Sequence, residues 1–159
     1  MNASAKNVPH PLRMNSSGFT LIELMVTIAV LAIIVGIAAP SISTQLANQR
    51  VKSTAAMLEN ALKETKVESV IRRQALEFSF DDSTHSMVTK TKGVSPDEVA
   101  SYSYSSKSII KAGKSSITFN PSKRADAVVY NICDKNSSVT MQVIVTAVAN
   151  ISTAAGGTC

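Results

Sequence analysis

Tryptophan is absent and aromatic residues make up only 4 % of the chain, so extended stacking surfaces for bases or sugars are not expected. Two cysteines and two histidines are too few for a zinc site built from these residue types alone. Charged residues contribute only 17 % and hydrophobic residues 45 %, which excludes a disordered chain. The 159 residues predict one domain, and 16 Lys+Arg against 11 Asp+Glu give a net charge of +5.

The chain has one long apolar run, residues 19–39, in which only Thr20, Glu23 and Thr27 are polar. As a helix this run is about 32 Å long, enough to cross the hydrocarbon core of a bilayer. Lys6 and Arg13 precede it without any acid, which favours a cytoplasmic N-terminus and an exported remainder. A removable signal peptide is the alternative, but its apolar region is normally shorter and carries no carboxylate.

Glu23 is the residue of the apolar run that most needs a partner. A carboxylate at that depth costs on the order of 2–3 kcal/mol on insertion scales. Cleavage between Gly18 and Phe19 would create an α-ammonium group four residues before Glu23, in the same chain or in a neighbouring one. The alternative is that Glu23 lies near the membrane face and extends its carboxylate into water.

The segment Gly18-Phe19-Thr20-Leu21-Ile22-Glu23-Leu24, followed by an apolar helix and Pro40, resembles the N-terminal signature of type IV prepilins and type II secretion pseudopilins. The resemblance implies a leader over residues 1–18, cleavage after Gly18 by a prepilin peptidase and N-methylation of Phe19. It also implies that Glu23 aligns an incoming subunit with the N-terminus of its neighbour, and it assigns residues 19–40, up to Pro40, to assembly. Met14 is an alternative start, which would leave a leader without a basic residue.

Beyond Pro40 the apolar pattern becomes amphipathic. Val51, Ala55, Leu58 and Leu62 recur at helical spacing, so the helix is expected to continue over residues 41–74, with a kink at Pro40. Residues 75–159 are expected to form a β-rich head, with strands at 76–80, 87–92, 102–104, 117–119, 127–132 and 139–148. Residues 93–116 read as a loop with one short strand. The predicted class is α+β, a long helix packed on an antiparallel sheet.

The second half of the chain indicates a resemblance to a smaller group within this family. Val70-Ile71-Arg72-Arg73-Gln74, a strand, and later Ile117-Thr118-Phe119-Asn120-Pro121 with Cys133 resemble the FimT/FimU/GspH group of minor pilins and pseudopilins, FimU above all. The resemblance implies an inner-membrane subunit with a periplasmic head that moves to the pilus tip and helps to start assembly, with other minor pilins and the major pilin as partners. The alternatives are a GspH-like subunit of a type II secretion system and a FimT-like DNA-capturing pilin, so twitching, secretion and natural transformation remain open.

Cys133 and Cys159 fit this interpretation, because both lie on the exported side, where a disulfide is favoured. A bridge would close a 27-residue loop and stabilise the head by about 3.5 kcal/mol in the chain-entropy model. The alternative is a reactive or metal-binding thiol. No nucleophile elbow, phosphate-binding loop or metalloprotease motif is present, so we expect no catalytic residue, no metal and no cofactor.

DNA binding is the rival hypothesis from another functional class. Residues 136–159 carry no charged side chain, so the basic C-terminal motif of DNA-capturing relatives is absent. A phosphate-facing patch could still be formed by Lys107, Lys111, Lys114, Lys123 and Arg124. Ordinary solubilising lysines are the favoured interpretation, and DNA contact is possible but not favoured.

Overall fold

The computed structural model describes residues 18–159, without the side chains of residues 38–40. Residues 1–17 of the predicted leader, with Lys6, Arg13 and Met14, lie outside the described residues. The chain divides into two compact units at Ala38 and Ala39, and each unit is described by itself. Pro40, where the sequence predicts a kink, lies next to this division, and the kink stays a prediction.

The single helix of the described part, α1, spans Leu21–Ile71. It ends three residues before the predicted Gln74 because Arg73 adopts a left-handed backbone conformation, with φ of 52°. The N–H of Gln74 donates to the Ser69 carbonyl and the N–H of Arg73 to the Val70 carbonyl. These two bonds form a Schellman motif, which closes a helix without requiring glycine at the left-handed position.

No single helix among residues 18–159 meets the combined length and hydropathy of a membrane span. The segments Leu21–Ile37 and Ser41–Ile71, taken together across their break, do meet it by length and composition.

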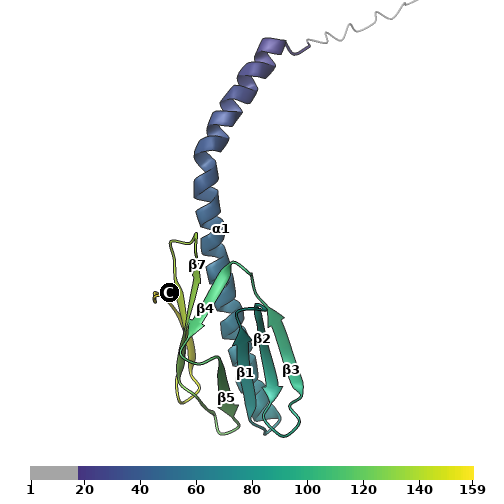
Figure 1. The fold of residues 1–159 in the computed structure, drawn as a ribbon, viewed down its shortest axis with the longest axis vertical. Coiled ribbons are helices and arrows are strands. Elements are labelled where there is room, and N and C mark those ends of the chain that lie inside the picture. Colours follow the sequence, from purple (N-terminus) through teal and green to yellow (C-terminus); the bar gives the residue numbers. More distant parts are fainter. Residues whose placement is uncertain (1–17) are drawn as a thin grey trace, which may run out of the picture. The chain divides into compact units, whose positions relative to one another are not determined.

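The strands form two antiparallel sheets, and Figure 1 shows them beside the C-terminal part of α1. The first sheet has the order β3-β2-β1-β5-β6 and the second the order β4-β7-β8-β9. The strand bounds are β1 Leu76–Asp81, β2 Ser86–Thr91, β3 Glu98–Ser103, β4 Ser108–Ala112, β5 Ser116–Asn120, β6 Arg124–Ala125, β7 Val128–Asp134, β8 Met141–Val145 and β9 Ile151–Ala155. The α+β class is therefore confirmed, with two sheets in place of the single predicted one. We call β1 to β9 the head.

The core lies between Ser41–Ile71 and the two sheets. The predicted helical stripe is fully buried at all four positions, Val51, Ala55, Leu58 and Leu62. Phe78 of the first sheet and Tyr130 of the second meet edge-to-face there, with ring centroids 6.3 Å apart. One helix face thus joins two sheets into one hydrophobic core.

Two strand predictions were wrong in detail. The interval 93–116 contains two strands, β3 and β4, and not one. The predicted strand 139–148 ends at Val145, because the chain turns at Thr146–Ala149, where Ala149 has φ of 53°. The tail that follows returns as β9, paired with β8.

Candidate assembly site

The predicted cleavage junction lies in a short non-helical segment directly before α1. Gly18 is exposed, and a Cβ atom built on it would meet nothing within 4 Å. The Phe19 side chain is 77 % exposed. Both residues at the junction are therefore accessible, as an endopeptidase substrate must be.

Glu23 occupies the first turn of α1. The carbonyl of Thr20 accepts from the N–H of Leu24, and the Thr20 hydroxyl accepts from the N–H of Glu23 at 3.3 Å. Thr20 is therefore the N-cap, and Glu23 stands at the third helical position, where a carboxylate interacts favourably with the helix dipole. The Thr-x-x-Glu spacing of a capping box stands at the start of the apolar run and is a signal of this cap in the sequence.

The helix surface beyond Glu23 is apolar and uncovered. The large apolar side chains from Phe19 to Ile37 are between 49 % and 77 % exposed. Soluble monomers rarely expose a continuous apolar surface of this length, which marks a surface covered by lipid or by other protein chains. Glu23 is the only ionisable side chain within it.

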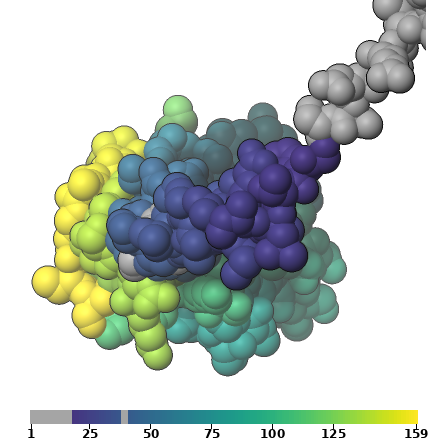
Figure 2. All heavy atoms as spheres, turned by 90° about the horizontal axis from the view of Figure 1, so that it is seen from above, coloured from purple at the N-terminus to yellow at the C-terminus, as the bar shows by residue number. Residues whose placement is uncertain are grey.

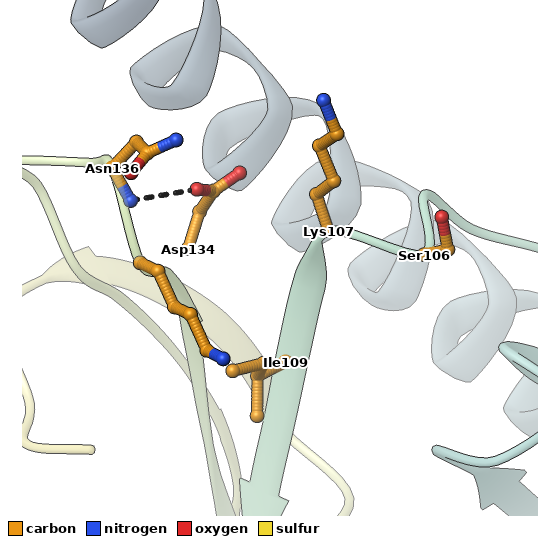
Figure 3. Close-up of a pocket in the computed structure, with 6 residues that line it drawn as sticks. Ser106, Lys107, Ile109, Asp134 and Asn136 are labelled. Carbon is orange, nitrogen blue, oxygen red and sulfur yellow. Dashed lines mark hydrogen bonds between the residues drawn. The ribbon is translucent and has the colours of Figure 1, made fainter.

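An ion pair joins the helix segment Ser41–Ile71 to the head. The Arg50 Nε atom lies 2.9 Å from Asp134 Oδ2, and the Asn136 N–H donates to Oδ1 of the same carboxylate. In Figure 3 the Asp134 carboxylate lies between Asn136 and Lys107, beside a pocket of about 460 Å³. Burial alone would raise the pKa of Asp134, but Arg50, the Asn136 N–H and Lys107 outweigh it and lower the pKa. Asp134 is thus held as a carboxylate.

The residues after β9 form a strap over the outer face of the second sheet. The N–H of Gly156 donates to the Thr140 carbonyl, and Gly157 lies against Asn131 and Gln142. Cys159 is joined to Cys133 of β7 by a disulfide, and the two Cα atoms are 6.5 Å apart. The strap therefore crosses β8 and is tied covalently to β7.

The five cations considered for DNA contact are spread along the head. Lys107 precedes β4 near Asp134, whereas Arg124 lies at the other end of the head, beyond Val128. The length of β7 between these ends is roughly 20 Å. Lys111 donates to the Cys159 main-chain oxygen, and Lys114 is 3.8 Å from Asp126. Lys123 lies in the β5–β6 turn, and Arg124 begins β6.

Within residues 18–159, no group of three or more His, Cys, Asp or Glu side chains is placed to hold a metal ion. His85 packs instead against the Tyr104 ring, with centroids 5.6 Å apart.

Comparisons with known proteins identify a sequence motif and a similar fold. Residues 13–39 match the family model of the prokaryotic N-terminal methylation motif. No curated protein matches the sequence.

Two solved structures are similar over about two thirds of the chain. The type IV minor pilin FimU of Pseudomonas aeruginosa aligns with a TM-score of 0.60 and 15 % identity, covering 70 % of this chain and 96 % of FimU. The minor pseudopilin EpsH of the Vibrio cholerae type 2 secretion system aligns with a TM-score of 0.59 and 10 % identity, covering 67 % of this chain and 97 % of EpsH. The chain thus combines the N-terminal methylation motif with the fold of type IV minor pilins and minor pseudopilins.

Proposed function

We propose that this chain is a minor pilin of the FimU type. A prepilin peptidase cleaves it between Gly18 and Phe19, and the new N-terminus is methylated at Phe19. The protein then leaves the inner membrane for the tip of a type IV pilus, where it helps to start assembly with other minor pilins and the major pilin. The observation that carries the proposal is the uncovered apolar helix with a single carboxylate at its capped start.

Glu23 has the central role in this proposal. A buried carboxylate is stable only beside a cation, and a neighbouring subunit supplies one as its new α-ammonium group. Pairing of Glu23 with that group sets the axial position of each incoming subunit. The matched methylation motif and the exposed Gly18–Phe19 junction support the processing that creates the cation.

The test is to substitute Glu23 in the full chain in cells that assemble filaments. Glu23→Ala is expected to lower incorporation into sheared filaments more than tenfold, the effect of losing a buried ion pair. Export and cleavage are expected to continue, as seen from disulfide formation and from the mass of the mature N-terminal peptide. Normal incorporation of Glu23→Ala would refute the role of Glu23.

Glu23→Gln is the matched control for charge. Glutamine keeps the length of the side chain and suits the third helical position after a Thr cap, so the helix start is preserved. A defect in Glu23→Gln as large as that in Glu23→Ala assigns the effect to charge. Incorporation restored by Gln would assign it to side-chain shape instead.

The runner-up is a GspH-like minor pseudopilin, because FimU and EpsH align with similar TM-scores. Deletion of the gene separates the two. Loss of surface pili and twitching with normal secretion supports the pilin, and loss of secreted enzymes with intact pili supports the pseudopilin.

A further inference from the structure

The two sheets have four edge strands, and three of these edges are closed. β3 follows Pro96, begins at Glu98 and pairs with β2 through a register shift between Thr89 and Lys90. Proline, charge and irregular register are devices that keep a sheet edge from pairing with other chains.

β6 and β4 are closed in other ways. β6 has two residues, and its Ala125 N–H donates to the Ala147 carbonyl. In β4 the Ile110 N–H donates to the carboxylate of Asp82, which lies in the turn between β1 and β2 of the first sheet. Neither strand offers a free row of backbone groups.

β9 is the open edge. Its pairing with β8 places Val143 opposite Thr153, and the N–H of Gly156 donates to the Thr140 carbonyl. In an antiparallel ladder, bonding alternates from residue to residue, so Ile151, Thr153 and Ala155 direct their N–H and C=O groups away from β8. Within the part of the chain that the structure describes, these outward N–H groups have no acceptor. Figure 2 shows this yellow end of the chain at one margin of the head.

The β9 edge also lacks the charges, prolines and covering segments that normally prevent a sheet edge from pairing with another chain. β9 and its neighbours in residues 136–159 contain no charged side chain and no proline. The strap leads away from the edge, across β8 towards β7, and so leaves it uncovered. An uncharged, regular and uncovered strand is a template for adding another strand.

The charge on the helix flank beside β9 indicates which charge a strand added to this edge would carry. The Thr153 hydroxyl donates to Glu59 Oε2 at 2.6 Å, which places β9 against that flank of α1. Lys52, Lys63 and Lys66 are seven, four and seven residues from Glu59, so they lie on the same flank. Only Lys63 pairs with Glu59, and no carboxylate of residues 18–159 lies within 4 Å of the Lys52 or Lys66 ammonium group. The flank therefore carries a surplus of positive charge.

We infer that the β9 edge binds an extended, acidic segment of another subunit, which adds to the second sheet as a fifth strand. Main-chain bonds to Ile151, Thr153 and Ala155 provide the pairing. Alternate side chains of the segment face α1, where acidic groups meet Lys52 and Lys66. The inference rests on the proposed function only in naming the partner as another pilin-type subunit.

Two substitutions at one position isolate the main-chain pairing. Thr153→Pro removes an outward N–H and places a ring at the edge, while the ladder to β8 is unchanged. Thr153→Ala removes the same hydroxyl bond to Glu59 but keeps the N–H. We expect Pro to lower partner binding about tenfold and Ala to leave it within about twofold.

Binding is measured by photo-crosslinking in the full-length protein in membranes that also contain the other prepilins of the same cells. The probe is a benzophenone amino acid at exposed Ser152 of β9, with exposed Ser101 of β3 as the matched position. We expect an adduct from Ser152 that maps to an acidic, extended segment of another pilin-type subunit and depends on Thr153 as above. Equal adduct yields in Thr153→Pro and Thr153→Ala would overturn the inference. An adduct to a helix, a lipid or DNA would overturn it as well.

Charge reversal on α1 provides a second, independent test. Lys52→Glu with Lys66→Glu is expected to lower the Ser152 adduct several-fold, while Lys90→Glu on the first sheet leaves it unchanged. An adduct that is insensitive to the first pair would refute the acidic partner. Normal filament incorporation without any Ser152 adduct would refute the β9 inference and leave the proposed function intact. Failure to enter filaments, with the adduct present, would refute the proposed function alone.

Discussion

Gly157 provides the sharpest test of the strap. Its φ of +99° is strained for any residue with a side chain, at a cost of about 1–3 kcal/mol. A Cβ atom there would lie 2.4 Å from Asn131 Oδ1 and 2.7 Å from Gln142 Cγ. These side chains must then separate and lose their 2.8 Å hydrogen bond, which is worth about 1 kcal/mol. Gly157→Ala is therefore expected to destabilise the head by about 2–4 kcal/mol.

Gly156→Ala is the matched control. Gly156 has φ of +124°, but a Cβ atom there would meet nothing within 4 Å, so only backbone strain is added. The assay is urea unfolding of the oxidised protein in detergent, followed by circular dichroism. We expect Gly157→Ala to be less stable than Gly156→Ala by about 1 kcal/mol. Equal stability of the two variants, or a Gly157→Ala protein as stable as the parent, would contradict the close packing of the strap.

Two further predictions concern buried polar groups of the head. The Tyr130 hydroxyl is buried without a hydrogen-bond partner among residues 18–159, so Tyr130→Phe is expected to raise the free energy of unfolding by about 1 kcal/mol. A lower urea midpoint would show that the hydroxyl is satisfied. The pKa of Asp134 is lowered in the folded state, so its stabilising effect is present above the unfolded value of about 3.9 and is lost as the pH falls through the folded value. Asp134→Asn is expected to cost about 1–3 kcal/mol at pH 7, because Arg50 stays half-buried and unpaired. The variant should also lose less stability than the parent below pH 4, and parallel pH profiles would refute this assignment.

The helix and its buried face follow from periodicity, because the apolar residues Val51, Ala55, Leu58 and Leu62 recur at spacings of four, three and four residues. β4 escaped detection because one of its buried positions is Ser108, whose hydroxyl bonds to Thr54 at a distance of 3.0 Å. A polar residue satisfied by a tertiary partner gives no alternating pattern in the sequence. Neither the two-sheet arrangement nor the strap is readable locally, since both depend on contacts between distant segments.

The residues of the candidate site likewise divide into those that the sequence predicts and those that it does not. Gly18, Phe19 and Glu23 are neighbours in the chain, so a local motif was enough to find them. The five cations considered for DNA contact are near one another in the sequence, but the length of β7 lies between Lys107 and Arg124. The open edge of β9 is not among the sequence predictions, because the last predicted strand is 139–148, whereas Ile151–Ala155 forms a further paired strand.

The Cys133–Cys159 bond has a mechanical consequence. A pull applied between α1 and residue 159 passes through the disulfide to β7 and bypasses the 26 residue intervals between the two cysteines. Roughly 90 Å of contour length is thereby withheld from extension. Under tension β8 and β9 stay unloaded, and the first structures to bear the force are α1 and the strands from β1 to β7.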